Sequence, residues 1–230
     1  MNLMTLAALC ALFAHGGGQA PPPGTDCVSV ARAYEARLTA VTPMVSRPSA
    51  RDAIARVAYA EAGNQGDTGL AGVVYAVLNR MMDGGFGGDV TAVLDAPHQF
   101  EPVTRAGSWQ RLPPRSAVER AHIDTILNLA LDGRLPDPTN GARFFQNPAI
   151  VAARAEAGTA SPDRVNFGGQ APVAVLRDHA FYTTGNGSSA GVAKQPSLFV
   201  PVQTASDGGA DAASAPSSSQ PSSLFVPLSR

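Results

Sequence analysis

One acidic side chain, Glu61, stands where it could do chemistry. It follows Ile54, Val57 and Ala58 at helical spacing. The glycine-rich stretch GNQGDTG (63–69) begins two residues later. A helix would place these four side chains on one face, so the carboxyl group should point inward rather than into bulk water. Burial raises the pKa of a carboxyl group, and an acid that is protonated near neutral pH can give its proton to a leaving oxygen. The same placement would also suit a structural acid that bonds a nearby turn or pairs with an arginine.

The composition limits the classes of protein to which the chain can belong. Its 230 residues suffice for one compact domain with flanking segments, and a net charge of -1 gives no sign of a nucleic-acid-binding surface. Both cysteines, Cys10 and Cys27, precede the expected domain, so its core should need no disulfide. The four histidines are scattered without acidic or cysteine neighbours at ligand spacing. We therefore expect no metal site and no organic cofactor.

The first 20 residues resemble a signal or signal-anchor segment. The run from Leu3 to Ala14 is apolar but too short to cross a membrane, and no Lys or Arg precedes it. We expect membrane contact only through this segment, in a protein that is exported to the periplasm or cell envelope or is associated with a phage virion. The alternative is an apolar N-terminus of a cytoplasmic or virion protein. Residues 21–48 are predicted to form a Gly/Pro linker, a short helix over Cys27–Val41 and a break at two prolines.

Residues 49–184 are predicted to form the folded domain, which should be mainly α (α+β). One helix should begin at Ser49, with Ser49 and Asp52 as a capping box, and Asp67 or Thr68 should cap the next. Leu70 to Met81 show the clearest helical spacing of apolar residues in the chain. The other expected elements are a short helix over 90–95, a long loop over 96–114, a helix over 116–132, an extended run near Phe145 and a small β-hairpin within 165–182.

The last segment, residues 185–230, is rich in Gly, Ser, Ala, Pro and Asp and is predicted to be disordered. It contains two near-copies, QPSLFVPV (195–202) and QPSSLFVPL (220–228). They are too short and too far apart to stack as structural repeats, so we interpret them as docking motifs for a partner. The alternative is a duplicated segment without function.

Four motifs in order resemble the SleB/CwlJ-type cell-wall hydrolases. ARVAYAEAGNQGDTGLAGVVYAVLNR (55–80) is similar to a family helix that ends in YAEARGE and is followed by a second helix that closes in NR. VLDAPHQF (93–100), DPTNGARFFQNP (137–148) and DHAFY (178–182) resemble later family segments. The ordered set is more specific than any single motif.

This resemblance implies a lysozyme-like helical domain that cleaves the glycan strands of peptidoglycan between N-acetylmuramic acid and N-acetylglucosamine. It also implies that Glu61 is the general acid, since the family's acid aligns with it. Family members commonly act as lytic transglycosylases, in which the sugar's own 6-hydroxyl closes on C1. One carboxyl group suffices for that reaction, whereas glycosidases that use water normally need two.

Several other residues are expected to line the glycan cleft. Gln99 could bond acetamido or hydroxyl groups, and Phe100 could stack on a sugar face. Trp109 could stack likewise or cap the core, Asn147 could bond substrate or hold a turn, and the Tyr182 hydroxyl could reach the cleft. Asn79 and Arg80, at a helix end, are expected to be structural and to tie down neighbouring carbonyls.

The sequence departs from the family at two charged positions, because Gln65 replaces a usual second acid and Gly63 a usual arginine. Asp67 and Glu101 are the nearby acids that could compensate. Glu101 directly follows Gln99 and Phe100 and could reach the cleft and bind substrate, or it could be a solvated loop acid. Two rival hypotheses follow. One is a muramidase that uses water, and the other is a catalytically weak protein of the same fold that binds the wall or belongs to a virion.

Overall fold

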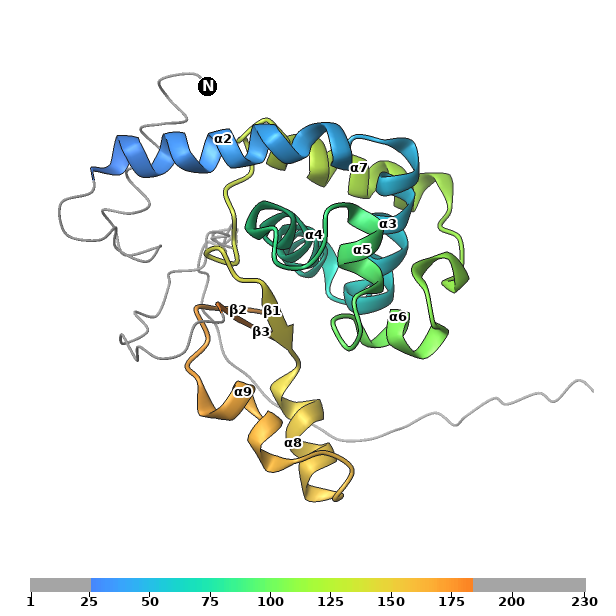
Figure 1. Cartoon of the computed structure of the whole chain (residues 1–230). Helices are drawn as coiled ribbons and strands as arrows, with labels where there is room; N and C mark the ends of the chain where they lie inside the picture. Colours follow the sequence, from blue (N-terminus) through green and yellow to red (C-terminus); the bar gives the residue numbers. More distant parts are fainter. Residues whose placement is uncertain (1–25, 184–230) are drawn as a thin grey trace, which may run out of the picture. The chain divides into compact units, whose positions relative to one another are not determined.

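The computed structural model describes residues 26–183, except for the side chain of Cys27 (Figure 1). The predicted signal segment and the tail with its two docking motifs lie outside the described residues. Between residues 26 and 183, no helix is long and apolar enough to cross a membrane.

The described chain is mainly helical, as predicted, with one small antiparallel sheet. Its elements are α2 (Cys27–Val45), α3 (Pro48–Ala62), α4 (Gly66–Asp83), α5 (Val90–Asp95), α6 (Glu101–Ala106), η1 (Trp109–Arg111), α7 (Ala117–Leu131), β1 (Phe144–Gln146), α8 (Pro148–Glu156), η2 (Pro162–Arg164), α9 (Asn166–Gly169), β2 (Ala174–Leu176) and β3 (His179–Tyr182).

Helix α4 is the centre of the helical part. Every residue from Gly69 to Met81 is buried, which is typical of a helix that is covered on all sides. In Figure 1 it lies among α2, α3, α5 and α7, and it packs against each of them. The core formed in this way also includes the apolar faces of α3 and α7.

The helix ends differ from the predicted ones. Pro43 lies inside α2 rather than after it, because burial of Val41 and Val45 against the core outweighs the hydrogen bond that proline cannot donate. Helix α3 begins at Pro48, so Ser49 is not its cap. Proline suits this first position, where no helical hydrogen bond is required of its nitrogen.

Three further differences concern the start of α4, the expected loop and α8. Helix α4 starts at Gly66, after Gln65, and neither Asp67 nor Thr68 caps it. The predicted loop over 96–114 contains α6 and η1, and α8 was not predicted. By contrast, α5 has the predicted bounds, and Ser116 and Glu119 form a capping box at the start of α7.

The predicted hairpin is confirmed as β2 and β3, and β1 adds a third strand in the order β1-β3-β2. The sheet approaches α4 closely at Gly72. A β-carbon there would lie 2.7 Å from Phe181 Cζ and 3.0 Å from Leu176 Cδ1. The absence of a side chain at Gly72 therefore allows the sheet to pack directly against the central helix.

Candidate active site

Glu61 is the penultimate residue of α3, and its carboxyl group lies at the boundary between the core and an exposed turn. Gly63 and Asn64 in that turn are exposed, whereas Glu61 itself is half-buried. Its Oε1 atom is buried and has no hydrogen-bond partner. The predicted inward orientation is therefore what the structure shows, and the carboxyl group retains an unused bonding position.

The surroundings of Glu61 favour its protonated form. Burial is the main cause that raises the pKa of this carboxyl group, to about 7, and the negative charge of Glu101 acts in the same direction. The backbone N–H of Glu101 and the positive charges of Arg80 and Arg105 act in the opposite direction. At neutral pH a large fraction of Glu61 therefore carries the proton that a general acid needs.

Glu101, the first residue of α6, has the opposite character. Its Oε1 accepts hydrogen bonds from Arg105 Nη2 at 2.7 Å and from Arg154 Nη2 at 2.7 Å, and its Oε2 accepts one from Arg154 Nη1 at 3.1 Å. The bonds from Arg154 are the main cause that lowers the pKa of Glu101. One protonated and one ionised carboxyl group thus lie near each other, which is the pattern of an acid and a partner base.

Of the two acids that could replace the family's second one, Glu101 is the one whose charge raises the pKa of Glu61. The side chain of Asp67 is mostly exposed, and its carboxylate lies 3.2 Å from His122 Nε2 on α7. The other ring nitrogen of His122 is hydrogen-bonded to the Tyr59 hydroxyl at 3.0 Å. Asp67 therefore belongs to a separate contact between α4 and α7.

Arg80 on α4 is a further charged group of the site, and the sequence predicted only a structural role for it. Arg80 is 1% exposed. The central carbon of its guanidinium group lies 4.6 Å from the ring centre of Phe100, 5.2 Å from that of Phe86 and 5.6 Å from that of Phe144. Its Nε donates to the Arg143 carbonyl at 2.6 Å. Its Nη1 is buried without a partner.

The expected structural role is confirmed for Asn79 and for one end of Arg80. Asn79 Nδ2 donates to the Ala142 carbonyl at 3.0 Å, to Asp137 Oδ2 at 2.9 Å and to Thr139 Oγ1 at 3.2 Å. These bonds fix the chain that leads into β1. The NR pair at the end of the central helix therefore connects the helical part with the sheet.

Two aromatic residues that were expected to line a cleft lie in the core. Phe100 is 1% exposed and its ring faces Arg80, so it offers no free face to a sugar. Trp109 is also buried, with the Arg56 guanidinium 5.7 Å from its ring centre. Of the two roles considered for Trp109, stacking on a sugar or capping the core, this placement is the second. Both placements arise because short helices turn the expected loop inward.

The other predicted binding residues are placed as follows. Asn147 caps α8, since its Oδ1 accepts a hydrogen bond from the Ile150 amide at 3.1 Å. Of the two roles considered for Asn147, binding substrate or holding a turn, this placement is the second. Tyr182 is 1% exposed, and its hydroxyl donates to Asn166 Oδ1 at 2.8 Å. Gln99 is half-buried in the turn before α6. Of the set, Gln99 and Glu101 are the ones that lie beside Phe100 with accessible surface.

The placement of Tyr182 predicts a change in stability rather than in binding. Tyr182→Phe removes its bond to Asn166, and we expect the free energy of unfolding to fall by about 1 kcal/mol. Co-sedimentation with purified sacculi should stay as in the wild type. Weaker co-sedimentation at an unchanged denaturation midpoint would instead show that the hydroxyl contacts the glycan.

Sequence reasoning also missed Arg105 and Arg154, which bind Glu101. The spacing of Glu101 and Arg105, four residues apart with Pro102 between them, is a signal of a short helix with an ion pair. No local signal connects Arg154 with this pair, because it lies 53 residues after Glu101. In the part of the chain that the structure describes, no group of three or more His, Cys, Asp or Glu side chains could hold a metal ion.

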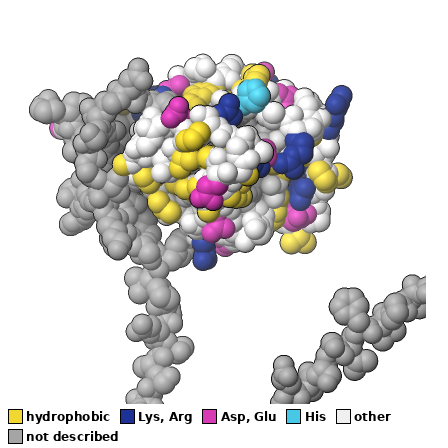
Figure 2. All heavy atoms as spheres, turned by 90° about the horizontal axis from the view of Figure 1, so that it is seen from below, with side chains coloured by type: hydrophobic (Ala, Val, Ile, Leu, Met, Phe, Trp, Pro, Cys, Tyr) yellow, Lys and Arg dark blue, Asp and Glu magenta, His cyan; other side chains and the backbone are white. Residues whose placement is uncertain are grey.

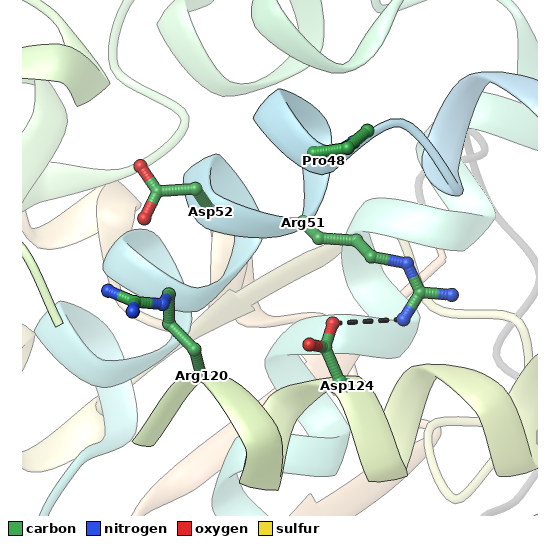
Figure 3. Close-up of a pocket in the computed structure, with 5 residues that line it drawn as sticks. All are labelled: Pro48, Arg51, Asp52, Arg120 and Asp124. Carbon is green, nitrogen blue, oxygen red and sulfur yellow. Dashed lines mark hydrogen bonds and ion pairs between the residues drawn. The ribbon is translucent and has the colours of Figure 1, made fainter. Parts of the chain in front are cut away.

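A hollow between α3 and α7 is separate from this site. Pro48, Arg51, Asp52, Arg120 and Asp124 line it (Figure 3). Its charged groups have partners: Arg51 pairs with Asp124 at 2.9 Å, and Asp52 accepts from Arg56 at 2.9 Å. Arg51 precedes Glu61 by ten residues, about 15 Å along the helix axis. The hollow therefore lies at the opposite end of α3 from the candidate acid.

The surface beside α8 and α9 carries side chains of mixed character. Figure 2 views the molecule from below, where these two helices lie in Figure 1, and acidic, basic and hydrophobic side chains are interspersed on this face. Nucleic-acid-binding surfaces typically concentrate positive charge on one face. This face shows no such concentration of positive charge (Figure 2).

The chain is similar to a known protein family. A family model described as Cell Wall Hydrolase matches residues 64–182, which is slightly more than half of the chain. The match begins just after Glu61 and includes Gln65, Asn79, Arg80 and Glu101. No curated protein and no solved structure matches the chain.

Proposed function

The chain belongs to the cell wall hydrolase family, as its motifs predicted, and we propose that Glu61 is the acid with which it cleaves peptidoglycan. The bond cleaved would be that between N-acetylmuramic acid and N-acetylglucosamine. The observation that carries this proposal is a half-buried carboxyl group, next to an exposed glycine-containing turn, whose pKa is raised to about 7. Such a group can protonate a glycosidic oxygen at neutral pH.

We propose lytic transglycosylation as the reaction. Glu61 gives its proton to the glycosidic oxygen as the bond from that oxygen to C1 breaks. The resulting carboxylate then takes the proton of the muramic acid 6-hydroxyl, whose oxygen bonds to C1. The products are a 1,6-anhydro end and a free 4-hydroxyl on the other sugar, and Glu61 is protonated again. No water molecule is consumed, so a single carboxyl group can serve as acid and base.

One observation favours hydrolysis as a second candidate. Glu101 is an ionised carboxylate near Glu61, and a base of this kind could activate water or act as nucleophile. However, both of its oxygens accept hydrogen bonds from Arg105 or Arg154. A carboxylate held in this way is a weaker base and a weaker nucleophile than a free one. We therefore rank hydrolysis second.

Mass spectrometry of the fragments released from purified sacculi distinguishes the two reactions. Ends 18 mass units lighter than reducing muramic acid would support transglycosylation, since the anhydro product lacks one water. Reducing ends that take up ¹⁸O from labelled water would show hydrolysis. A protein that pellets with sacculi but releases no fragments would support the wall-binding hypothesis instead.

The proposed substrate implies that the protein acts outside the cytoplasmic membrane, because peptidoglycan lies there. We propose that segment 1–20 exports the enzyme, with delivery by a phage particle as the alternative route. In the second case the SLFVP motifs of the tail would dock to a component of that particle. A fusion of residues 1–48 to a reporter that is active only after export separates the two routes.

A further inference from the structure

Arg80 is a buried cation with only part of its bonding capacity used. Three aromatic rings surround its guanidinium, and Nε bonds the Arg143 carbonyl, while Nη1 has no partner. Burial of an unpaired charge is costly, which is why buried arginines normally have a carboxylate partner or a full set of hydrogen bonds. The aromatic rings stabilise part of the positive charge of Arg80, but they provide no hydrogen-bond partner for Nη1.

The group with the matching deficiency is Glu61. Its Oε1 is also buried without a partner, and the charges of Arg80 and Glu61 act on each other. The other charged groups that act on Glu61 are Glu101 and Arg105, both from α6. Each of these two is also engaged in its ion pair. Arg80 is therefore the cation near Glu61 whose free donor has no other use.

A purely structural role explains less of this arrangement. Asn79, the preceding residue, fixes the same connection to the sheet through the Ala142 carbonyl without any charge. Burial lowers the pKa of Arg80 to about 10, so the guanidinium still carries its charge at neutral pH. A side chain needed only to fill space between Phe86, Phe100 and Phe144 would not require a positive charge.

We propose that Arg80 is a positioning residue for Glu61, held rigidly by the aromatic rings so that its positive charge stabilises the carboxylate formed after proton transfer. This rests on the proposed function of Glu61 as the acid. When Glu61 gives its proton away, a negative charge appears in a largely buried place. A fixed cation nearby lowers the energy of that charged state without any rearrangement during the reaction. The carboxylate stabilised in this way would then act as the base in the second step of the reaction.

The first test leaves Arg80 unchanged: it follows the wild-type protein and uses Glu61→Gln only as its control. Side-chain ¹⁵N signals of Arg80 and ¹³C signals of Glu61 are followed by NMR between pH 5 and pH 9. We expect the Arg80 signals to shift with the same midpoint as the Glu61 carboxyl group, and this shift to vanish in Glu61→Gln. Arg80 signals that do not respond to the ionisation of Glu61 would overturn the proposal.

The second test uses the pH dependence of sacculus digestion at low substrate concentration. Activity requires protonated Glu61, so it falls as pH rises past the pKa of that group. We call this fall of activity at high pH the alkaline limb. Arg80→Met removes the nearby positive charge, and we expect the midpoint of the alkaline limb to rise by roughly one pH unit. The maximal rate should fall about tenfold, because the carboxylate loses its stabilising charge.

Two further variants separate charge from packing. Arg80→Lys keeps the charge and should keep the wild-type position of the alkaline limb. Asn79→Ala weakens the same connection to the sheet and should lower the denaturation midpoint while the limb stays in place. An alkaline limb that is the same in Arg80→Met as in the wild type would show that Arg80 is only structural. If Glu61→Gln keeps full activity while the wild-type protein shows the NMR coupling, the proposed function fails and the interaction between Arg80 and Glu61 stands.

Discussion

Glu61→Gln is expected to lower the rate at which the protein solubilises purified sacculi by roughly a thousandfold. Glutamine has nearly the same size and hydrogen-bonding reach, but it has no proton to give to the glycosidic oxygen. Since the Glu61 side chain is already mostly neutral at pH 6, the substitution hardly changes the charge of the site. The measurement is the release of soluble fragments at pH 6, with co-sedimentation to show that the variant still binds sacculi.

Two matched variants make this result specific. Glu156→Gln removes an exposed acid on α8 and should digest sacculi like the wild type. Glu101→Gln removes the ionised neighbour, and under transglycosylation it should keep most of the activity. A loss in Glu101→Gln as large as that in Glu61→Gln would instead point to a two-carboxylate hydrolytic reaction. Equal digestion by wild type and Glu61→Gln would exclude Glu61 as the acid.

The features that sequence analysis predicted correctly are those that local periodicity determines. Apolar residues at helical spacing located α4, α5 and α7, and the same spacing placed Glu61 on the inner face of α3. A Gly-Gly pair followed by Val173, Val175 and the run Ala180–Tyr182 located the hairpin. In each case one segment buries one stripe or one face, so the pattern needs no knowledge of what lies opposite.

The features that it missed depend on contacts between distant segments. Phe100 and Trp109 are large apolar groups in a stretch without a helical period, and such groups can face either a ligand or the core. The structure shows that Arg80 from α4 and Arg56 from α3 lie against them. The connection between Glu101 and Arg154 is of the same kind. No spacing rule relates residues that come together only after the helices pack.

The caps illustrate a different reason for error. Ser49 and Asp52 have the spacing of a capping box, yet α3 begins one residue earlier, at Pro48. Asp52 instead pairs with Arg56 one turn later, at 2.8 Å. Both uses of Asp52 are locally reasonable, and the choice between them depends on how α2 delivers the chain to α3. Cap motifs therefore predict that a helix starts nearby better than they predict its first residue.

The raised pKa of Glu61 also has a consequence for stability that is independent of activity. A carboxyl group with an ordinary pKa of 4.5 when unfolded, and of about 7 when folded, binds its proton more tightly in the folded protein. Between these two pH values the folded state holds more protons than the unfolded state, so stability falls as pH rises. The stabilisation is fully present below pH 4.5 and is lost as pH rises through 7.

Glu61→Gln should therefore become more stable than the wild type at alkaline pH, while it loses activity. Glutamine cannot ionise, so the variant avoids the cost of placing a carboxylate in this largely buried position. We expect the difference in free energy of unfolding between variant and wild type to grow by about 2–3 kcal/mol from pH 4 to pH 8. Urea denaturation at four or five pH values measures it, with Glu156→Gln as the control for loss of an exposed acid. Stability curves that stay parallel over this range would contradict a buried, high-pKa Glu61, whereas diverging curves would show that the acid is kept at the expense of stability, as expected for a group selected for chemistry.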